Sequence, residues 1–426
     1  MAEQIDSGQT DTAADAAFAA DRTQAVTLGD AVRAYVGRVR GGDMGALPAV
    51  LGLVVLFIVF RVLSDKFLIE LNLTNLLIQA GSIMILAMAL VPVLLLGEID
   101  LSAGVAGGVS ACSMGVLMVE KGWPWGAAVA AALVVGAFIG FIIGLLVAKL
   151  GIPSFVVTLA FFLGLQGVTL KLIGEGGSVR IAQPVIAGIA NDTMSTLWGW
   201  IAAIVIVAGF AALSLLRHRR QVTQGLQHQP TVVVWVQIVV VALIAVGVVA
   251  LLNANRSVNP NFPISGIPYV IPLVAVLFIA MTFVLGRTSY GRHIYAVGGN
   301  AEAARRAGIA VDRIRVSVFI WCSGLAAVSG IVQASYVGKV STSSGGGNTL
   351  LYAVAAAVIG GTSLFGGKGK ARDAVIGGLV IATIANGLGL LNQAAYINFV
   401  VTGGVLLLAA SVDAVSRRRR SASGLG

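Results

Sequence analysis

The sequence carries little charge. Only 11% of its 426 residues are Asp, Glu, Lys or Arg, whereas 58% are hydrophobic. Soluble domains contain about 25% charged residues, so the charge present here could not cover a water-exposed surface. Mean hydropathy is +0.95, and several apolar runs reach about 20 residues, the length that crosses a bilayer. The composition excludes a soluble domain and predicts an all-α polytopic membrane protein.

Cysteine and histidine are also scarce. The two cysteines, Cys112 and Cys322, fall within apolar runs, which argues against a disulfide. The three histidines, His218, His228 and His293, lie in polar segments without metal-ligand spacing. No apolar run holds a nucleophile with a neighbouring base. The sequence therefore predicts no catalytic residue, no metal site and no cofactor bound by this chain.

Twelve apolar segments predict about twelve transmembrane helices. They lie near 47–63, 74–96, 101–119, 125–149, 154–173, 197–216, 232–252, 266–285, 316–337, 349–365, 373–391 and 396–412. The segment 349–365 is short, so it is also compatible with a broken or re-entrant helix. With the N-terminus inside, most of the 28 Lys and Arg residues fall on the cytoplasmic side. This bias predicts cytoplasmic termini and explains the net charge of +10 without nucleic acid.

The transmembrane domain is expected to cover residues 47–416. It follows a polar tail, 1–46, which is either disordered or carries a short amphipathic helix on the membrane surface. A hairpin at 197–252 looks inserted, and its basic loop either fixes the topology or touches a partner or lipid headgroups. Residues 417–426 form a basic cytoplasmic tail.

The polar segment 286–315 interrupts this apolar chain between two spans. Asn300 can cap a helix whose first turn holds Glu302 and whose last turn holds Arg305. Gly308 then suits a left-handed stop. Alanines keep the helix thin, so another protein surface can approach it closely. The pattern predicts a short cytoplasmic docking helix.

Two carboxylates, Glu98 and Asp100, stand between the second and third spans. Charges at membrane depth usually mark a function, so they are candidates for the inner end of a solute pathway. The alternative is that Asp100 caps the helix that follows. Ser154 and Thr158 lie one turn apart at the start of the fifth span. Their hydroxyls either contact a solute or bond back to their own helix.

Three glycine-rich loops complete the pattern. Residues 360–370 superficially resemble a phosphate-binding loop, but the required hydroxyl residue after Gly-Lys is missing. The chain therefore has no recognisable ATP site. Residues 174–178 and 341–348 are expected to be external polar loops, either flexible linkers or a surface for an external solute-binding partner.

In combination, four segments identify a resemblance to the permease subunits of bacterial ABC monosaccharide importers, the ribose/galactose/xylose/arabinose group. The matching segments are 97–102, 152–159, 291–309 and 359–364. The likeness runs from about residue 47 to the C-terminus. The hairpin at 197–252 is more similar to xylose permeases than to ribose permeases.

The resemblance implies the vitamin B12-type importer fold in the bacterial plasma membrane. Two permease copies form the pathway, two separate ATPase subunits bind ATP and Mg, and an extracytoplasmic protein delivers the sugar. The residues expected to couple to the ATPase are Tyr295, Gly298, Gly299, Asn300, Glu302, Ala303, Ala304, Arg305 and Gly308. The candidates for the pathway or gate are Glu98, Asp100, Ser102, Ser154, Thr158 and Asn386. The alternative is an ion-driven secondary transporter, which would carry ionisable residues near the bilayer centre.

Overall fold

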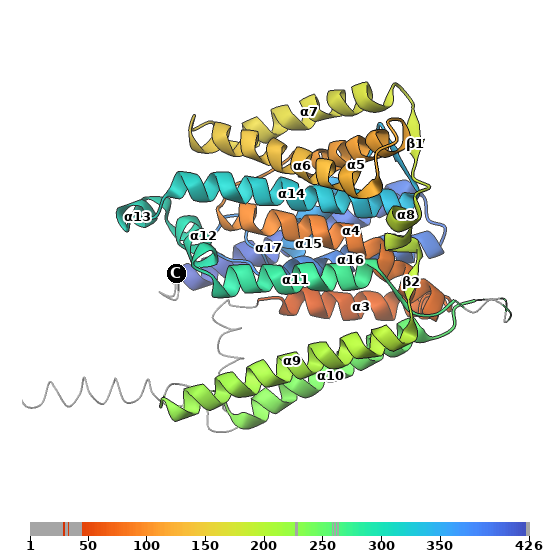
Figure 1. Cartoon of the computed structure of the whole chain (residues 1–426). Coiled ribbons are helices and arrows are strands. Elements are labelled where there is room, and N and C mark those ends of the chain that lie inside the picture. Colours follow the sequence, from red (N-terminus) through yellow and green to blue (C-terminus); the bar gives the residue numbers. More distant parts are fainter. Residues whose placement is uncertain are drawn as a thin grey trace, which may run out of the picture. The chain divides into compact units, whose positions relative to one another are not determined.

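The fold is helical throughout. The computed structural model describes residues 45–225, 229–257, 259, 261 and 264–422, together with Gly29 and Arg33. Within these residues there are 15 helices and four short strands (Figure 1). The expected amphipathic helix of the N-terminal tail lies outside the described residues.

Every predicted span corresponds to a helix. These helices are α3 (Leu47–Leu63), α4 (Glu70–Leu95), α5 (Ala103–Val119), α6 (Trp125–Ala148), α7 (Ser154–Ile173), α9 (Thr196–Thr223), α10 (Thr231–Asn253), α11 (Val270–Arg287), α14 (Val311–Val337), α15 (Thr349–Gly360), α16 (Ala371–Leu390) and α17 (Ala395–Ala422). Within the described part of the chain, eight of them are long and apolar enough to cross a membrane. The chain is therefore a polytopic membrane protein.

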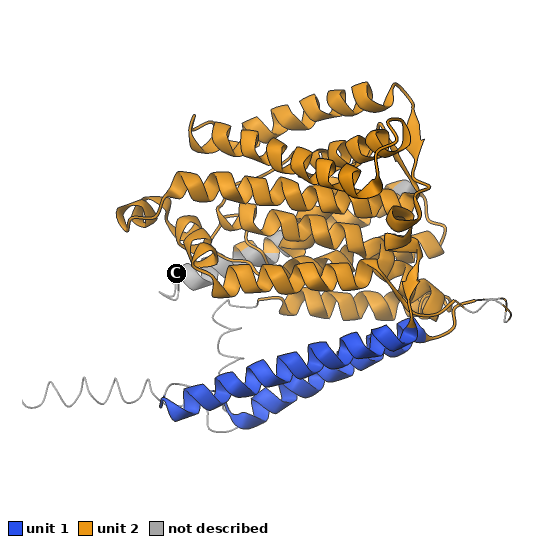
Figure 2. Cartoon of the chain, in the orientation of Figure 1, with its two compact units in different colours: residues 1–44, 196–253, 419–426 blue, residues 45–195, 254–418 orange. Residues whose placement is uncertain are grey.

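Two compact units divide the chain (Figure 2). The helices of the smaller unit are α9 and α10, the predicted hairpin. At one end the Asn253 amide donates to the Thr196 carbonyl at 3.4 Å, and toward the other end His218 and Thr231 form a 3.0 Å hydrogen bond. Only 11% and 17% of the apolar windows of α9 and α10 are buried. The hairpin thus presents apolar side chains on nearly all sides, as a lipid-embedded element does.

Among the eight helices long enough to cross a membrane, α4 is the most enclosed. Its apolar window is 78% buried, compared with 22% for α7 and 17% for α11. α4 carries no charged side chain beyond Glu70 in its first turn. A helix that is apolar all round belongs in the interior of a bundle, and α14 and α16 pack against it there.

Glycines bring α6 and α14 together. A Cβ at Gly136 or Gly140 would overlap the α14 backbone at Ser323 or Phe319, and one at Gly144 would crowd Val316. This four-residue spacing lets the two backbones meet, as small residues do between membrane helices.

The α15 helix is too short to span a bilayer. Its 12 residues extend about 18 Å at 1.5 Å per residue. The 342–348 segment before it follows α5, because carbonyl oxygens of Ser344 and Gly345 occupy the places where Cβ atoms of Gly108 and Gly104 would lie. We call residues 342–348 the re-entrant segment. Glycines on both sides allow this backbone contact, so the segment packs against α5.

Short elements that the sequence did not reveal gather at the end of the larger unit where α5 ends and α14 ends. Strand β1 (Ser178–Arg180) pairs antiparallel with β4 (Lys339–Ser341), and β2 (Thr193–Met194) pairs with β3 (Ile267–Pro268). Helix α8 (Pro184–Asn191) is tied to α14, since the Ser335 hydroxyl accepts from Ala190 N–H at 2.9 Å and donates to the Ala187 carbonyl at 3.0 Å.

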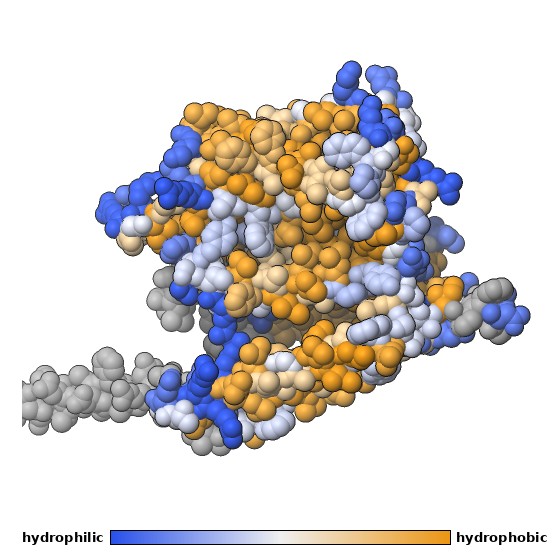
Figure 3. Space-filling view, viewed as in Figure 1, coloured by the Kyte–Doolittle hydropathy of each residue, from blue (hydrophilic) through white to orange (hydrophobic). Residues whose placement is uncertain are grey.

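Hydropathy follows the expected membrane pattern. In the larger unit, hydrophilic residues gather around α13 at one end and around β1 at the other, with an apolar band between them (Figure 3). We name these two the α13 end and the β1 end. Such a band between polar ends suits a hydrocarbon layer.

Candidate functional site

The predicted docking helix is present at the α13 end. α13 (Ala301–Arg306) is capped by Asn300, whose side-chain oxygen accepts from Ala303 N–H at 2.9 Å. Gly308 adopts φ +84°, the left-handed conformation expected for the stop. A further helix, α12 (Ser289–Gly299), precedes it and was not predicted. Its start is capped by Thr288, which accepts from Gly291 N–H at 3.1 Å.

The last turn of α12 sits directly on the end of α4. A Cβ at Gly298 would overlap the Leu95 carbonyl, whereas Gly299 has nothing within 4 Å of such a Cβ. The same Leu95 carbonyl accepts from Gly367 N–H at 2.9 Å. Tyr295 completes the contact by donating from its hydroxyl to the Gly369 carbonyl at 2.6 Å. α12 therefore touches both the end of α4 and the glycine-rich loop before α16.

The chain is broken between α4 and α5, at residues 96–102. Glu98 lies 3.3 Å from Arg315 Nε on α14, close enough for an ion pair but without hydrogen-bond geometry. Asp100 is buried, and its Oδ1 accepts from the Ser102 N–H at 2.8 Å and from the Ser102 hydroxyl at 2.6 Å. Burial raises the pKa of Asp100, and the two Ser102 hydrogen bonds oppose that shift. Asp100 thus braces the entry to α5, close to the predicted capping role.

The start of α7 grips the middle of this break. The Ser154 hydroxyl accepts from Ile99 N–H at 3.2 Å, and the Thr158 hydroxyl reaches the Ile99 carbonyl at 3.2 Å. Thr158 also bonds back to the Ser154 carbonyl at 2.8 Å. Both hydroxyls are therefore engaged with backbone. We call residues 96–102, α12 and loop 366–369, together with these clamps, the coupling junction.

Asn386 lies away from the coupling junction. Its amide exchanges two 3.0 Å hydrogen bonds with Asn72, near the start of α4. Both side chains are buried. The structure thus brings five of the six pathway candidates together and places Asn386 in a brace between α4 and α16.

The exposed side of α13 is charged. Glu302 pairs with Arg305 at 3.3 Å and with Arg306 at 3.2 Å, and Arg305 also lies 3.7 Å from Asp312. These groups are largely exposed, so the pairs contribute little stability. Ala303 is exposed, but Ala304 is buried within this chain. The surface available to a partner is therefore the charged side with Ala303.

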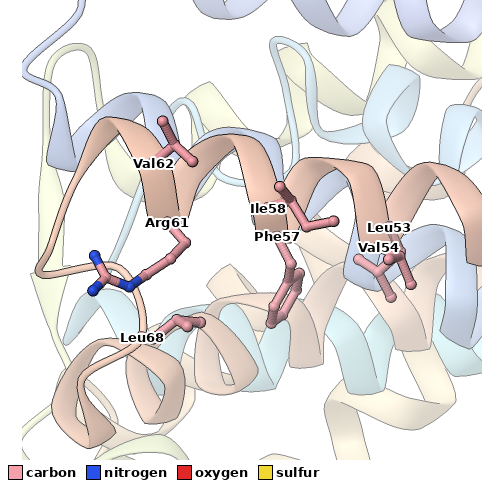
Figure 4. A pocket seen from close by; sticks show the side chains of 7 residues that line it. All are labelled: Leu53, Val54, Phe57, Ile58, Arg61, Val62 and Leu68. Carbon is pink, nitrogen blue, oxygen red and sulfur yellow. The ribbon is translucent and has the colours of Figure 1, made fainter.

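A second hollow is apolar and lies away from the coupling junction. It has a volume of about 430 Å³, and Figure 4 shows its lining side chains, Leu53, Val54, Phe57, Ile58, Arg61, Val62 and Leu68. The Arg61 guanidinium is paired with Asp65. A lining of hydrocarbon side chains suits an acyl chain better than a hydroxylated solute.

Sequence reasoning missed the partners of the junction. The sequence indicated the glycine-rich loop 360–370, but it did not point to Arg315, Leu95 or Gly367 as contact partners. The one available signal was Glu98 itself, because a carboxylate at a membrane boundary needs a cation. Which cation it meets depends on α14 packing, more than 200 residues along the chain. Among described residues, no His, Cys, Asp and Glu cluster could hold a metal ion.

The junction can transmit force. A push on α13 reaches α12, which rests without a side-chain buffer on the end of α4 at Gly298. A displacement of α12 would next reach the break between α4 and α5, which Arg315 and α7 hold in place. Backbone contacts and short bonds are stiff, because close-packed interiors deform little. This geometry links a surface helix to four membrane helices.

Comparison with known proteins agrees with these features. The family described as "Branched-chain amino acid transport system / permease component" matches residues 72–410. The xylose transport system permease protein XylH of Escherichia coli (strain K12) is 34% identical over 348 residues, which cover 82% of this chain and 86% of the relative. XylH of Haemophilus influenzae (strain ATCC 51907 / DSM 11121 / KW20 / Rd) is 33% identical over 372 residues, covering 87% and 96%.

A ribose permease is similar as well. The ribose import permease protein RbsC of Escherichia coli (strain K12) is 31% identical over 369 residues, which cover 86% of this chain and 92% of the relative. No solved structure matches the chain significantly. The predicted resemblance to sugar permeases is confirmed, and the ion-driven alternative gains no support. The chain belongs to the family of branched-chain amino acid transport system permease components.

Proposed function

We propose that this chain is the membrane-spanning subunit of an ATP-driven monosaccharide importer, with xylose as the candidate solute. The coupling junction carries this proposal, because it joins an exposed charged helix to the break between two membrane helices. The sugar class rests on the names of the relatives, which are xylose and ribose permeases.

The proposed assembly contains two copies of the chain in the bacterial plasma membrane. Two separate ATPase subunits would bind ATP and Mg and dock on α13, and an extracytoplasmic binding protein would deliver sugar at the β1 end. The α13 end and both termini are then cytoplasmic, in line with the basic residues there. We further propose the vitamin B12-type fold with up to twelve membrane passages, of which α15 makes only a partial one.

The proposed cycle is a two-state rigid-body switch. Closure of the ATPases on ATP would displace α13 and α12 together. Because α12 rests on the Leu95 carbonyl, the displacement would re-aim the α4–α5 break and open the pathway on the opposite side. The few polar groups in the spans are consistent with selection by the delivering protein rather than by this chain.

Uptake of radiolabelled xylose tests the whole proposal. Proteoliposomes would hold this chain, its ATPase and its binding protein, with ribose, galactose and arabinose as competitors and with ATP and the proton gradient varied separately. ATP-dependent uptake that only unlabelled xylose blocks is expected. Inhibition by another sugar would identify that sugar, and not xylose, as the solute. Uptake that collapses with an ionophore while ATP stays high would refute an ATP-driven mechanism.

A charge swap tests the docking surface. The double variant Glu302→Lys with Arg305→Glu keeps a pair within α13 and reverses the pattern shown to the ATPase. We expect the double variant to co-purify with at least about tenfold less ATPase, because like charges would then face each other at the edge of the contact between α13 and the ATPase. Asp65→Lys at the β1 end is the matched control. Full ATPase retention in the double variant would exclude α13 as the contact.

A further inference from the structure

The re-entrant segment forms one wall of a polar pocket. The pocket has a volume of about 270 Å³ and is lined by Val105 of α5, by Gln166, Thr169 and Leu170 of α7, and by Thr342, Ser343, Ser344, Gly346 and Gly347. One wall belongs to α7, which is long and apolar enough to cross a membrane, and α5 is a shorter apolar helix, so we place the pocket at membrane depth. Irregular backbone is tolerated at that depth only where it is buried in protein or lines a water-filled cavity.

Some hydroxyls of the pocket are already occupied. Ser344 accepts from Ser341 N–H at 2.9 Å, Ser343 and Ser341 share a 3.1 Å hydrogen bond, and Thr169 donates to the Leu165 carbonyl at 3.0 Å. These bonds hold the turn and the helix in shape. Ser344 keeps its O–H donor, whereas Thr169 has given its only donor to Leu165 and is 1% exposed, so Thr169 offers a solute little.

Two groups in the pocket are uncommitted. Within the described residues, neither the Gln166 amide nor the Thr342 hydroxyl has a hydrogen-bond partner, and one lines the pocket from α7 and the other from the re-entrant segment. An amide offers two donors and one acceptor oxygen, and a hydroxyl offers both. A polar group that is left unpaired away from water carries a free-energy cost. Water or a solute in the pocket removes that cost.

We propose that this pocket is a transient binding site for a small neutral polyol, a monosaccharide, in which Gln166 and Thr342 hydrogen-bond the solute hydroxyls. The inference rests on the proposed importer function and adds the site within the chain. No charged side chain lines the pocket, which disfavours an amino acid or an anion. Val105 and Leu170 supply apolar contacts for the C–H face of a sugar ring. The volume lies just below the roughly 300–1,000 Å³ of sites for drug-sized ligands, as a smaller solute requires.

Isosteric variants test the hydrogen bonds. Gln166→Leu and Thr342→Val keep side-chain volume and remove the polar atoms. In proteoliposomes with the ATPase and sugar-loaded binding protein, we expect sugar moved per ATP hydrolysed to fall about fivefold in each. ATP hydrolysis itself should stay within about twofold of wild type, since the coupling junction is untouched. Thr169→Val is the matched control, because its hydroxyl is already bonded to its own helix.

The outcomes separate the site from the function. The site would be overturned if Gln166→Leu and Thr342→Val both moved as much sugar per ATP hydrolysed as the wild type. It would also be overturned if Thr169→Val lost as much of this ratio as they do. A parallel fall in ATP hydrolysis would mean a folding or coupling defect and would also overturn it. Failure of the wild-type importer to take up any sugar would refute the proposed function instead, and it is visible before any variant is compared.

Thiol modification tests the pocket without relying on transport. The native Cys112 and Cys322 are buried, so a cysteine introduced as Thr342→Cys is the reactive one. A charged methanethiosulfonate should modify it at least about tenfold faster than the matched buried Ala106→Cys on α5, because thiolates form and react only where water reaches them. Equal rates would show that no aqueous pocket exists there.

Discussion

Two irregular segments lie next to α5, and they differ in how many of their polar groups have a partner. At residues 96–102 most polar groups are engaged: Glu98 with Arg315, Asp100 Oδ1 with Ser102 and the Ile99 peptide with α7, while the buried Asp100 Oδ2 has no hydrogen-bond partner among the described residues. In the re-entrant segment and the α7 wall facing it, Thr342 and Gln166 stay uncommitted.

The difference indicates two purposes for a broken membrane helix. A break whose groups are mostly bonded is stiff, and it suits the transfer of a displacement. A break with spare donors and acceptors suits a ligand that supplies the missing partners. Variants that act on one segment but not on the other are the way to separate these roles.

The largest effect is expected from Gly298→Ala. The added Cβ would overlap the Leu95 carbonyl, so α12 must move away from α4. Overpacking of this kind costs about 1–3 kcal/mol, and we expect ATP-dependent uptake to drop at least tenfold. Gly299→Ala is the control, because nothing lies near its Cβ. Uptake equal in both variants would show that the α12–α4 contact transmits nothing.

Gly108→Ala should act on the other segment. Its Cβ would overlap the Ser344 carbonyl and displace the re-entrant segment from α5. We expect sugar moved per ATP to fall about fivefold, with less loss of ATP hydrolysis than in Gly298→Ala. Gly324→Ala on α14, where a Cβ has open space, is the control. Loss of ATP hydrolysis as large as in Gly298→Ala would erase the distinction between the two segments.

A double-mutant cycle measures the pair that holds the first break. Glu98→Gln and Arg315→Gln each remove one charge of a pair whose side chains are 16% and 28% exposed. We expect each to cost about 2 kcal/mol of stability and the double variant to cost less than their sum, because an unpaired, partly buried charge is the main penalty. Thermal unfolding in detergent gives the energies. Strict additivity would mean that the two side chains do not interact.

The smallest effect concerns Asp100. Its folded pKa is raised by burial, so the folded state holds a proton that the unfolded chain releases, and stability falls as pH rises above about 3.8 toward the raised pKa. Asp100→Asn removes this ionisation and should flatten the pH dependence of unfolding. An unchanged slope between pH 4 and pH 7 would show that Asp100 ionises without cost.

The helices could be predicted well from the sequence because each membrane helix is a continuous run of apolar residues. The spans, the Asn300 cap and the Gly308 stop depend on local physics, which a single chain displays. Contacts between residues far apart in the chain do not depend on local physics alone. That Gly298 rests on Leu95, or that Ser154 and Thr158 clamp Ile99, follows from helix packing, which periodicity does not specify. The packing of residues 342–348 against α5 likewise follows from contacts across the chain.

Helix α14 connects the two ends of the larger unit as one continuous rod. Its 27 residues extend about 40 Å at 1.5 Å per residue. Arg315 near its start holds Glu98, and Ser335 near its finish holds α8. A rod held at both ends carries a tilt from one to the other without successive local rearrangements. Under the proposed function, we therefore expect the β1 end, which would meet the binding protein, and the α13 end, which would meet the ATPases, to change conformation together in a single step.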